Sequence, residues 1–158
     1  APTKTFNIPG LNVSYAVIPS KNNRKKFEYY AKNLHQSLPN VFGIEALKAA
    51  YFYGDEWLDA TKDYLFKNKE IIDSFVESND FVSGFSPEGT YLYWLDFSNT
   101  GMTFQKDISD RLKQAKIALS GGDFFFGGKE SLFFRFNFAT SADRVGDALT
   151  KIESCFGR

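Results

Sequence analysis

Lys4 is the first candidate for chemistry, because hydroxyl side chains and a glycine surround it in Thr3-Lys4-Thr5-Phe6-Asn7-Ile8-Pro9-Gly10-Leu11. A lysine in a tight, partly apolar turn can lose hydration, and a poorly hydrated amine is a nucleophile that forms Schiff bases. The alternative is a solvated lysine, since lysines are rarely buried. The spacing alone favours this alternative.

Arg135 is the second candidate, in the middle of an aromatic segment that alternates like a β-strand over residues 131–138. Alternation places Arg135 on one face of the strand, and it places four apolar side chains on the other: Leu132, Phe134, Phe136 and Phe138. A guanidinium in this position can bind a carboxylate through two parallel hydrogen bonds. A solvent-facing arginine is the alternative, which the pattern alone favours.

The other reactive side chains lack partners at useful spacings. The glycine-rich stretch from Gly121 to Gly128 lacks the lysine of a P-loop and the spacing of a dinucleotide-binding motif, so it favours a structural turn. His35 has no second ligand nearby, which indicates a surface or capping residue. Cys155 has no paired histidine motif, which indicates a small core residue. We therefore expect no metal site and no catalytic triad.

The composition limits the classes of partner. The chain has 158 residues, 43% of them hydrophobic, and 19 Lys and Arg against 19 Asp and Glu. Without a basic excess or a long apolar run, we expect no nucleic-acid or membrane partner. The single cysteine suits a reducing cytoplasm. Aromatic residues make up 18% of the chain, which predicts that some rings face another surface.

Periodicity and turn residues predict the order of the elements. Strands are expected at 12–18, 81–85, 90–97, 117–119 and 131–138, and helices at 24–34, 42–53, 55 to about 79, 103–115 and from 140 onward. From residue 55 the order is that of an α+β domain that can close around its own sheet. Residues 1–54 offer too little sheet to stand alone, so we place a boundary at the start of the long helix. Lys4 is expected in a turn immediately before the strand at 12–18.

The segment around Lys4 resembles Ser/Thr-Lys-x-Phe-Asn-x-x-Gly-Leu, which surrounds the cofactor-binding lysine of fold-type I pyridoxal-phosphate (PLP) enzymes, the aspartate aminotransferase superfamily. Further segments match in the same order along the whole chain: Pro39-Asn40-Val41-Phe42-Gly43, Ala49-Ala50-Tyr51, Gly54-Asp55-Glu56-Trp57-Leu58-Asp59, Thr90-Tyr91-Leu92-Tyr93-Trp94-Leu95-Asp96-Phe97 and Phe134-Arg135-Phe136-Asn137-Phe138-Ala139. The chain is most similar to the cystathionine β-lyase-like C-S lyases, which are often grouped with class I/II aminotransferases.

This resemblance implies an α/β fold, the C-terminal portion of a fold-type I PLP-dependent transferase fold. Residues 1–54 would be the C-terminal remnant of the large PLP-binding domain, and residues 55–158 the small C-terminal domain, with an antiparallel-rich sheet packed by helices. By the same resemblance, Lys4 binds the cofactor and is catalytic, Thr3 contacts the cofactor phosphate, and Arg135 receives the substrate α-carboxylate. Asn12 stands where many aminotransferases carry a phosphate-binding arginine, which favours a lyase.

The family's other cofactor contacts precede its lysine, so the resemblance implies a C-terminal fragment that needs its missing N-terminal half. We expect the parent to be a cytoplasmic, homodimeric enzyme that uses PLP to convert a sulfur amino acid to a thiol, pyruvate and ammonia. A class I/II aminotransferase is the alternative. For this chain alone, we expect no activity and consider a folding or association module.

Overall fold

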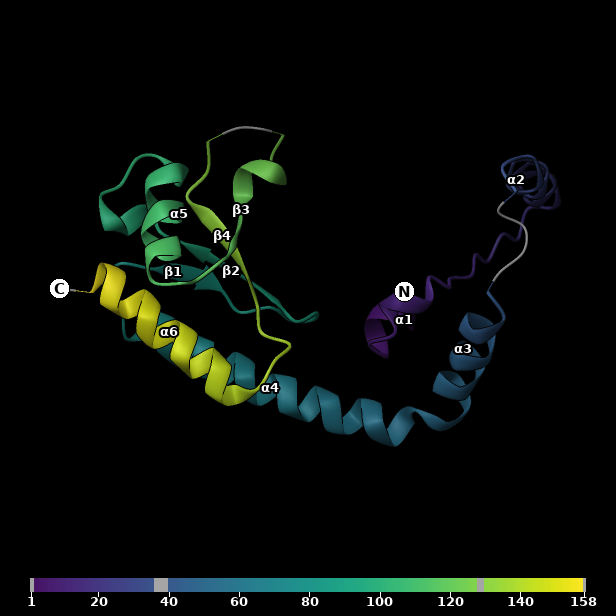
Figure 1. Cartoon of the computed structure of the whole chain (residues 1–158), viewed down its shortest axis with the longest axis horizontal. Helices are drawn as coiled ribbons and strands as arrows, with labels where there is room; N and C mark the ends of the chain where they lie inside the picture. Colours follow the sequence, from purple (N-terminus) through teal and green to yellow (C-terminus); the bar gives the residue numbers. More distant parts are fainter. Residues whose placement is uncertain (1, 36–39, 128–129, 158) are drawn as a thin grey trace. The chain divides into compact units, whose positions relative to one another are not determined.

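The computed structural model describes residues 2–35, 40–127 and 130–157 and contains two compact units, Ala1–Thr61 and Lys62–Arg158. The helix α4 (Asp55–Glu77) belongs to both units, because the division falls seven residues after the boundary expected from the sequence (Figure 1). Pro39, the first residue of a segment that matches the family, and Gly128, expected in the glycine-rich turn, lie outside the described residues. No helix within the described ranges is long and apolar enough to span a membrane.

The first unit contains helices and irregular segments. Its elements are α1 (Pro2–Thr5), η1 (Pro9–Leu11), α2 (Lys21–Asn33), α3 (Val41–Tyr53) and the first turns of α4. Side chains cap two of the helices at their N-termini: Ser20 accepts from the backbone N–H of Asn23, and Asn40 accepts from that of Phe42. The helices predicted at 24–34, 42–53 and 55–79 are confirmed, with ends displaced by up to three residues.

The strand predicted at 12–18 is wrong, because residues 12–20 have no regular secondary structure. Asn12 adopts a left-handed conformation, with φ 46° and ψ 47°, and ends η1. That conformation is incompatible with a strand. The described part of the first unit also contains no other strand with which this segment could pair. The expected turn at Lys4 is wrong too, since Lys4 lies on the short helix α1.

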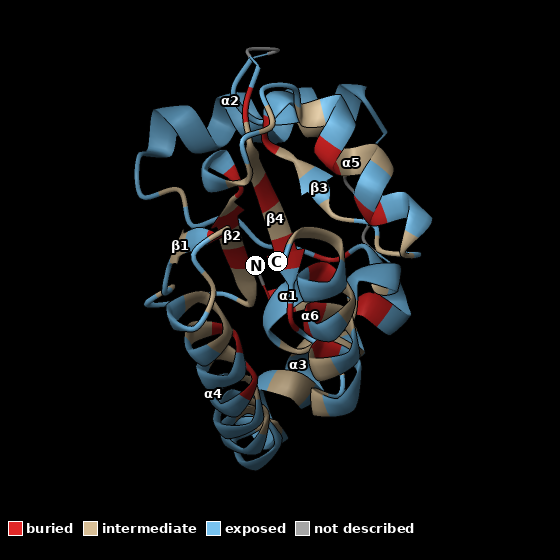
Figure 2. Ribbon diagram, turned by 90° about the vertical axis from the view of Figure 1, so that its left-hand side faces the viewer, coloured by how far each residue is buried: buried red, intermediate tan, exposed pale blue. Residues whose placement is uncertain are grey.

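The second unit contains a four-stranded antiparallel sheet in the order β1-β2-β4-β3, together with helices (Figure 2). After α4, the elements are β1 (Ser83–Phe85), β2 (Leu92–Asp96), η2 (Ser98–Thr100), α5 (Gln105–Gln114), β3 (Ser120–Gly121), η3 (Gly122–Phe124), β4 (Phe133–Asn137) and α6 (Ala142–Phe156). This arrangement confirms the predicted antiparallel sheet packed by helices.

The core of the second unit lies between one face of the sheet and the helices. The sheet contributes the buried side chains Tyr93, Leu95, Phe134 and Phe136, and the helices contribute Ile72, Ile108, Leu112, Val145, Leu149 and Ile152. The predicted alternation along β4 is confirmed, because Phe134, Phe136 and Phe138 are buried while Arg135 is half-buried. Each apolar side chain of this size contributes about 1.5–3 kcal/mol when fully buried. Arg135 therefore projects from the sheet face opposite the core.

The strand predicted at 117–119 is also displaced, since β3 begins at Ser120. The end of α5 explains the shift. Lys116 has a φ of 62°, its backbone N–H bonds the carbonyl of Lys113, and the N–H of Ile117 bonds the carbonyl of Leu112. These paired bonds form a Schellman motif. Ile117 thus completes the helix end, and sheet pairing starts three residues later.

Candidate active site

The surroundings of Lys4 are built by α1 and by the aromatic ring that follows it. The backbone N–H of Phe6 bonds the carbonyl of Pro2 at 2.9 Å, and the Phe6 ring packs against Tyr51 and Trp57, with centroids 5.7 and 6.3 Å away. Gly54 permits this packing, because a Cβ there would lie 2.7 Å from Phe6 Cε1. These contacts hold α1 against the other helices of the first unit.

The Lys4 side chain is exposed, and its ammonium has no hydrogen-bond or ion-pair partner within the described ranges. The neighbouring Thr3 is half-buried, and its carbonyl accepts from the backbone N–H of Ile8 at 2.9 Å. An amine and a hydroxyl on consecutive residues can bind a ligand that has both a carbonyl group and a phosphate group. The amine can add to the carbonyl carbon, and the hydroxyl can donate a hydrogen bond to the phosphate.

Arg135 occupies the central part of the sheet face that lies away from the core. Its direct cross-strand partners are Trp94 on β2 and Ser120 on β3. The guanidinium carbon lies 4.3 Å from the centroid of the Phe125 ring. Among the residues that the structure describes, none forms a hydrogen bond or an ion pair with the Arg135 guanidinium. A half-buried arginine without an anionic partner can bind a carboxylate.

A cavity of about 230 Å³ borders Arg135, between the chain leading into β3 and the segment that joins β4 to α6. Lys116 and Arg144 also line it, together with the polar side chains of Ser120 and Asn137, and its lining includes no acidic residue. The positive charges and donor groups favour an anionic ligand over a cationic one. Thr3 and Lys4 lie in the first unit and Arg135 in the second, each positioned by the contacts of its own unit.

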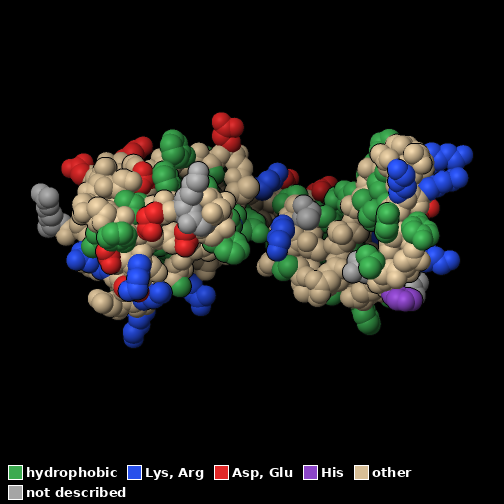
Figure 3. Space-filling view, turned by 90° about the horizontal axis from the view of Figure 1, so that it is seen from above, with side chains coloured by type: hydrophobic (Ala, Val, Ile, Leu, Met, Phe, Trp, Pro, Cys, Tyr) green, Lys and Arg blue, Asp and Glu red, His purple; other side chains and the backbone are tan. Residues whose placement is uncertain are grey.

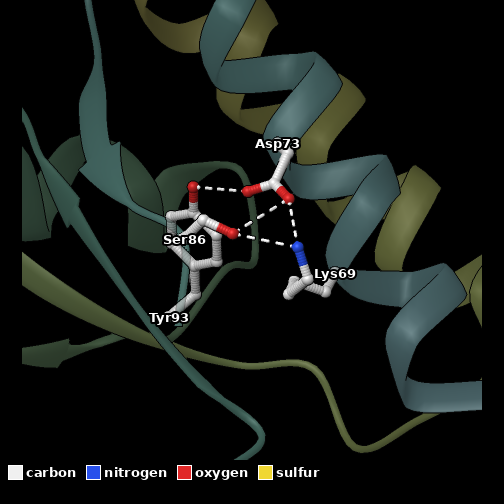
Figure 4. Close-up of polar contacts among 4 residues, drawn as sticks. All are labelled: Lys69, Asp73, Ser86 and Tyr93. Atoms are coloured by element: carbon white, nitrogen blue, oxygen red, sulfur yellow. Dashed lines mark hydrogen bonds and ion pairs between the residues drawn. The ribbon is translucent and has the colours of Figure 1, made fainter. Parts of the chain in front are cut away.

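A polar cluster at the end of the β1–β2 hairpin was not predicted (Figure 4). Asp73 accepts from Lys69 Nζ at 2.6 Å, from Ser86 Oγ at 3.0 Å and from Tyr93 Oη at 2.9 Å. Partial burial raises the pKa of Asp73, but these hydrogen bonds outweigh it and hold the pKa below its usual value. Burial and the Asp73 carboxylate raise the pKa of Tyr93 well above its usual value.

This cluster joins α4 to the hairpin and therefore has a structural role. The only sequence signal for it is the four-residue spacing of Lys69 and Asp73, which predicts a helical ion pair. The contributions of Ser86 and Tyr93 depend on strand pairing, which spacing does not reveal.

The remaining candidates form no reactive cluster with other side chains among the described residues. His35 is exposed with a φ of 54° just after α2, as expected for a surface or capping residue. Cys155 was expected in the core but is only half-buried, because it lies at the edge of α6 with its sulfur 3.8 Å from the carbonyl of Arg111. Gly122 packs closely against β4, which supports the structural turn. Within the described ranges, no group of three or more His, Cys, Asp or Glu could hold a metal.

Comparison with known proteins places these residues in context. No family model matches the chain. Cystathionine beta-lyase PatB of Bacillus subtilis is 34% identical over 155 residues, which make up 98% of this chain and 40% of that protein. Protein MalY of Escherichia coli is 31% identical over 137 residues, 85% of this chain and 35% of that protein.

The solved structures agree. A PLP-bound protein from Clostridium difficile 630, described as an aminotransferase, superposes with a TM-score of 0.93 and 33% identity, over 99% of this chain and 41% of its own. Cystalysin from Treponema denticola, whose crystals contain PLP, superposes with a TM-score of 0.88 and 28% identity, over 98% of this chain and 39% of its own. By sequence and fold, this chain belongs with the fold-type I PLP enzymes.

The resemblance stated from the sequence is therefore confirmed, as is the prediction of a portion of the fold-type I architecture. The chain spans about 40% of the length of the PatB relative. The roles of Lys4, Thr3 and Arg135 in a fold-type I enzyme stay predictions.

Proposed function

We propose that this chain is the C-terminal part of a PLP-dependent C-S β-lyase, which cleaves a sulfur group from an amino acid and releases a thiol, pyruvate and ammonia. The observation that carries the proposal is the similarity to a cystathionine beta-lyase over 98% of the chain. Further relatives with lyase names support it, among them the cystathionine beta-lyase of Corynebacterium glutamicum and the C-S lyase of Staphylococcus hominis. We place the parent enzyme in the cytoplasm as a homodimer.

The described residues fit PLP. Lys4 offers an exposed amine that has no partner among the described residues and can hold the cofactor covalently, and the adjacent Thr3 hydroxyl can donate to the cofactor phosphate. PLP, when bound, withdraws electrons from the substrate α-carbon and makes its proton acidic. The Lys4 amine would remove that proton as a general base. Arg135 would hold the substrate α-carboxylate through the two parallel hydrogen bonds of its planar fork.

A class I/II aminotransferase is the second candidate, favoured by specific relatives. The aspartate aminotransferase of Pyrococcus horikoshii is 25% identical over 96% of this chain. The two reactions share substrate binding and proton removal and differ in where the proton returns. Asn12 favours the lyase, because many aminotransferases carry a phosphate-binding arginine in its place. This inference depends on the family resemblance.

For this chain by itself we propose a module that acts through association and is inactive in catalysis. The support is the number of exposed aromatic side chains, and Figure 3 shows hydrophobic side chains, coloured green, on the surface of the chain. In the first unit, Phe42, Phe52 and Tyr53 are each at least 75% exposed. Aromatic side chains at such exposure are typical of surfaces that another body of protein covers. The remaining part of the longer enzyme would be that body.

The deciding experiment is a product assay on the longer protein that contains this chain. With cystathionine as substrate, we expect a thiol and pyruvate in equal amounts, without an added keto acid. If the amino group is instead transferred to an added keto acid, and no thiol and pyruvate are released, the aminotransferase would replace the lyase as the proposed function. Neither reaction with any amino acid would refute the enzyme proposal.

A further inference from the structure

Phe125 is a half-exposed aromatic residue that packs on the guanidinium of Arg135. The distance of 4.3 Å from the guanidinium carbon to the ring centroid is within the range of about 6 Å over which a cation–π attraction acts. Trp94, the cross-strand partner of Arg135, packs edge-on against the same Phe125 ring, with centroids 5.3 Å apart and planes at 88°. The Phe125 ring thus contacts both Arg135 and the residue beside it on β2.

The backbone around Phe125 is fixed by a set of hydrogen bonds. The N–H groups of Phe125 and Phe126 both bond the carbonyl of Gly122 at 2.9 Å. The turn is tied to α5, because the N–H of Asp123 bonds Gln105 Oε1 at 3.0 Å. The Phe126 ring also packs on Trp94, with centroids 5.6 Å apart. The position of the Phe125 ring is therefore restricted by the hydrogen bonds of its backbone and by its packing against Trp94.

This contact leaves the hydrogen-bonding capacity of Arg135 free. An aromatic face attracts the guanidinium without accepting its N–H groups in ordinary hydrogen bonds, so the planar fork stays available for a carboxylate. A free arginine side chain has many rotamers, and restricting them before a ligand binds lowers the entropic cost of binding. Arg135 also borders a cavity whose lining includes no acidic residue that could occupy the fork.

We propose that Phe125 is a positioning residue for substrate binding, which holds the Arg135 guanidinium in the orientation that accepts the substrate α-carboxylate. The inference rests on the proposed role of Arg135 in binding that carboxylate. It adds a residue that touches neither substrate nor cofactor and acts through Arg135.

The kinetic test uses the longer protein. Phe125→Leu keeps an apolar side chain but removes the aromatic face, so we expect the KM for the amino-acid substrate to rise about three- to thirty-fold while kcat stays within about a factor of two. Phe125→Tyr keeps the ring and should restore the KM. Phe124→Leu is the matched control, because Phe124 is 84% exposed and its ring packs against Phe125 rather than Arg135.

A second measurement does not depend on turnover. A dicarbonyl reagent that modifies guanidinium groups should label Arg135 several times faster in Phe125→Leu than in the wild type or in Phe124→Leu, with exposed Arg144 as the internal reference, as followed by peptide mass spectrometry. An unchanged KM, an unchanged labelling rate, or equal effects of Phe124→Leu would overturn the inference. If the wild type transaminates instead of releasing pyruvate, the lyase proposal fails, and the KM comparison is made on the transamination reaction.

Discussion

At the scale of single residues, β-strand alternation was enough to place Arg135 outside the core, and the structure confirms that placement. The same reasoning could not identify Phe125 or Trp94 as its neighbours. Trp94 reaches Arg135 through the pairing of β2 with β4, and Phe125 reaches it through a turn whose geometry depends on Gly122. Cross-strand register and turn conformation are set by tertiary packing, which one sequence does not display.

Replacing Arg135 with lysine should weaken substrate binding in the longer protein. A lysine keeps the charge but loses the planar fork, so we expect kcat/KM to fall by a factor that corresponds to about 1.5–3 kcal/mol, the range for hydrogen bonds to charged groups. Arg144 is exposed and lines the same cavity, so Arg144→Lys is the control, and it should change the free energy that corresponds to kcat/KM by no more than about 0.5 kcal/mol. An unchanged kcat/KM in Arg135→Lys would make Arg135 an ordinary surface arginine.

Asp73 should contribute stability that depends on pH. Its folded pKa lies below the usual value, so its contribution is present above the unfolded pKa of about 3.9 and is lost as pH falls through the lower folded pKa. We therefore expect Asp73→Asn to destabilise the chain by about 1–2 kcal/mol at pH 7, as measured by denaturant unfolding. The difference from wild type should shrink below pH 4.

Asp110→Asn is the control for this measurement. Asp110 also accepts a hydrogen bond from a lysine four residues away, Lys106, but its side chain is more exposed than that of Asp73 and has no tyrosine partner among the described residues. Asp110→Asn should therefore lower the free energy of unfolding by less than Asp73→Asn does. Equal losses in the two variants would show that the contacts of Asp73 with Ser86 and Tyr93 contribute nothing.

At the scale of elements, the longer helices α2 to α6 were predictable from their apolar periods and from end signals such as Gly54 after α3, whereas the four-residue helix α1 was not. The strands were less predictable. The segment at 12–18 has a strand composition but no partner among the described residues of its unit, and the segment at 117–119 follows a helix end that the sequence does not mark with glycine. Composition alone therefore indicated strands where pairing was absent.

Gly122 should be required for the turn that carries Phe125. A Cβ at this position would lie 2.5 Å from Ser131 Oγ and 3.0 Å from the carbonyl oxygen of Phe133, which belongs to β4. We expect Gly122→Ala to destabilise the chain by about 1–3 kcal/mol through overpacking, measured by thermal unfolding. Gly146→Ala is the matched control, because Gly146 lies in α6 with open space around its Cβ position, and it should stabilise the chain. A normal melt for Gly122→Ala would contradict the account of the turn.

At the scale of the whole molecule, the aromatic excess predicted exposed rings, and the structure contains many of them. The structure divides into two compact units at residues 61 and 62, within α4, and the assignment of residues 1–54 and 55–158 to a large and a small domain stays a prediction. A long helix with apolar residues along its length gives no local signal for where one unit's contacts end. That division emerges only from the packing of distant segments.

The central claim is that Lys4 is the residue that holds PLP, and covalent trapping tests it most directly. Borohydride reduction makes a lysine–PLP linkage permanent, so the longer protein, incubated with PLP, reduced and digested, should carry the label on the peptide that contains Lys4. Lys4→Ala should lose both the label and pyruvate release while its thermal melt stays close to that of wild type, because the Lys4 side chain is exposed. A label on another lysine, or wild-type pyruvate release by Lys4→Ala, would contradict the account.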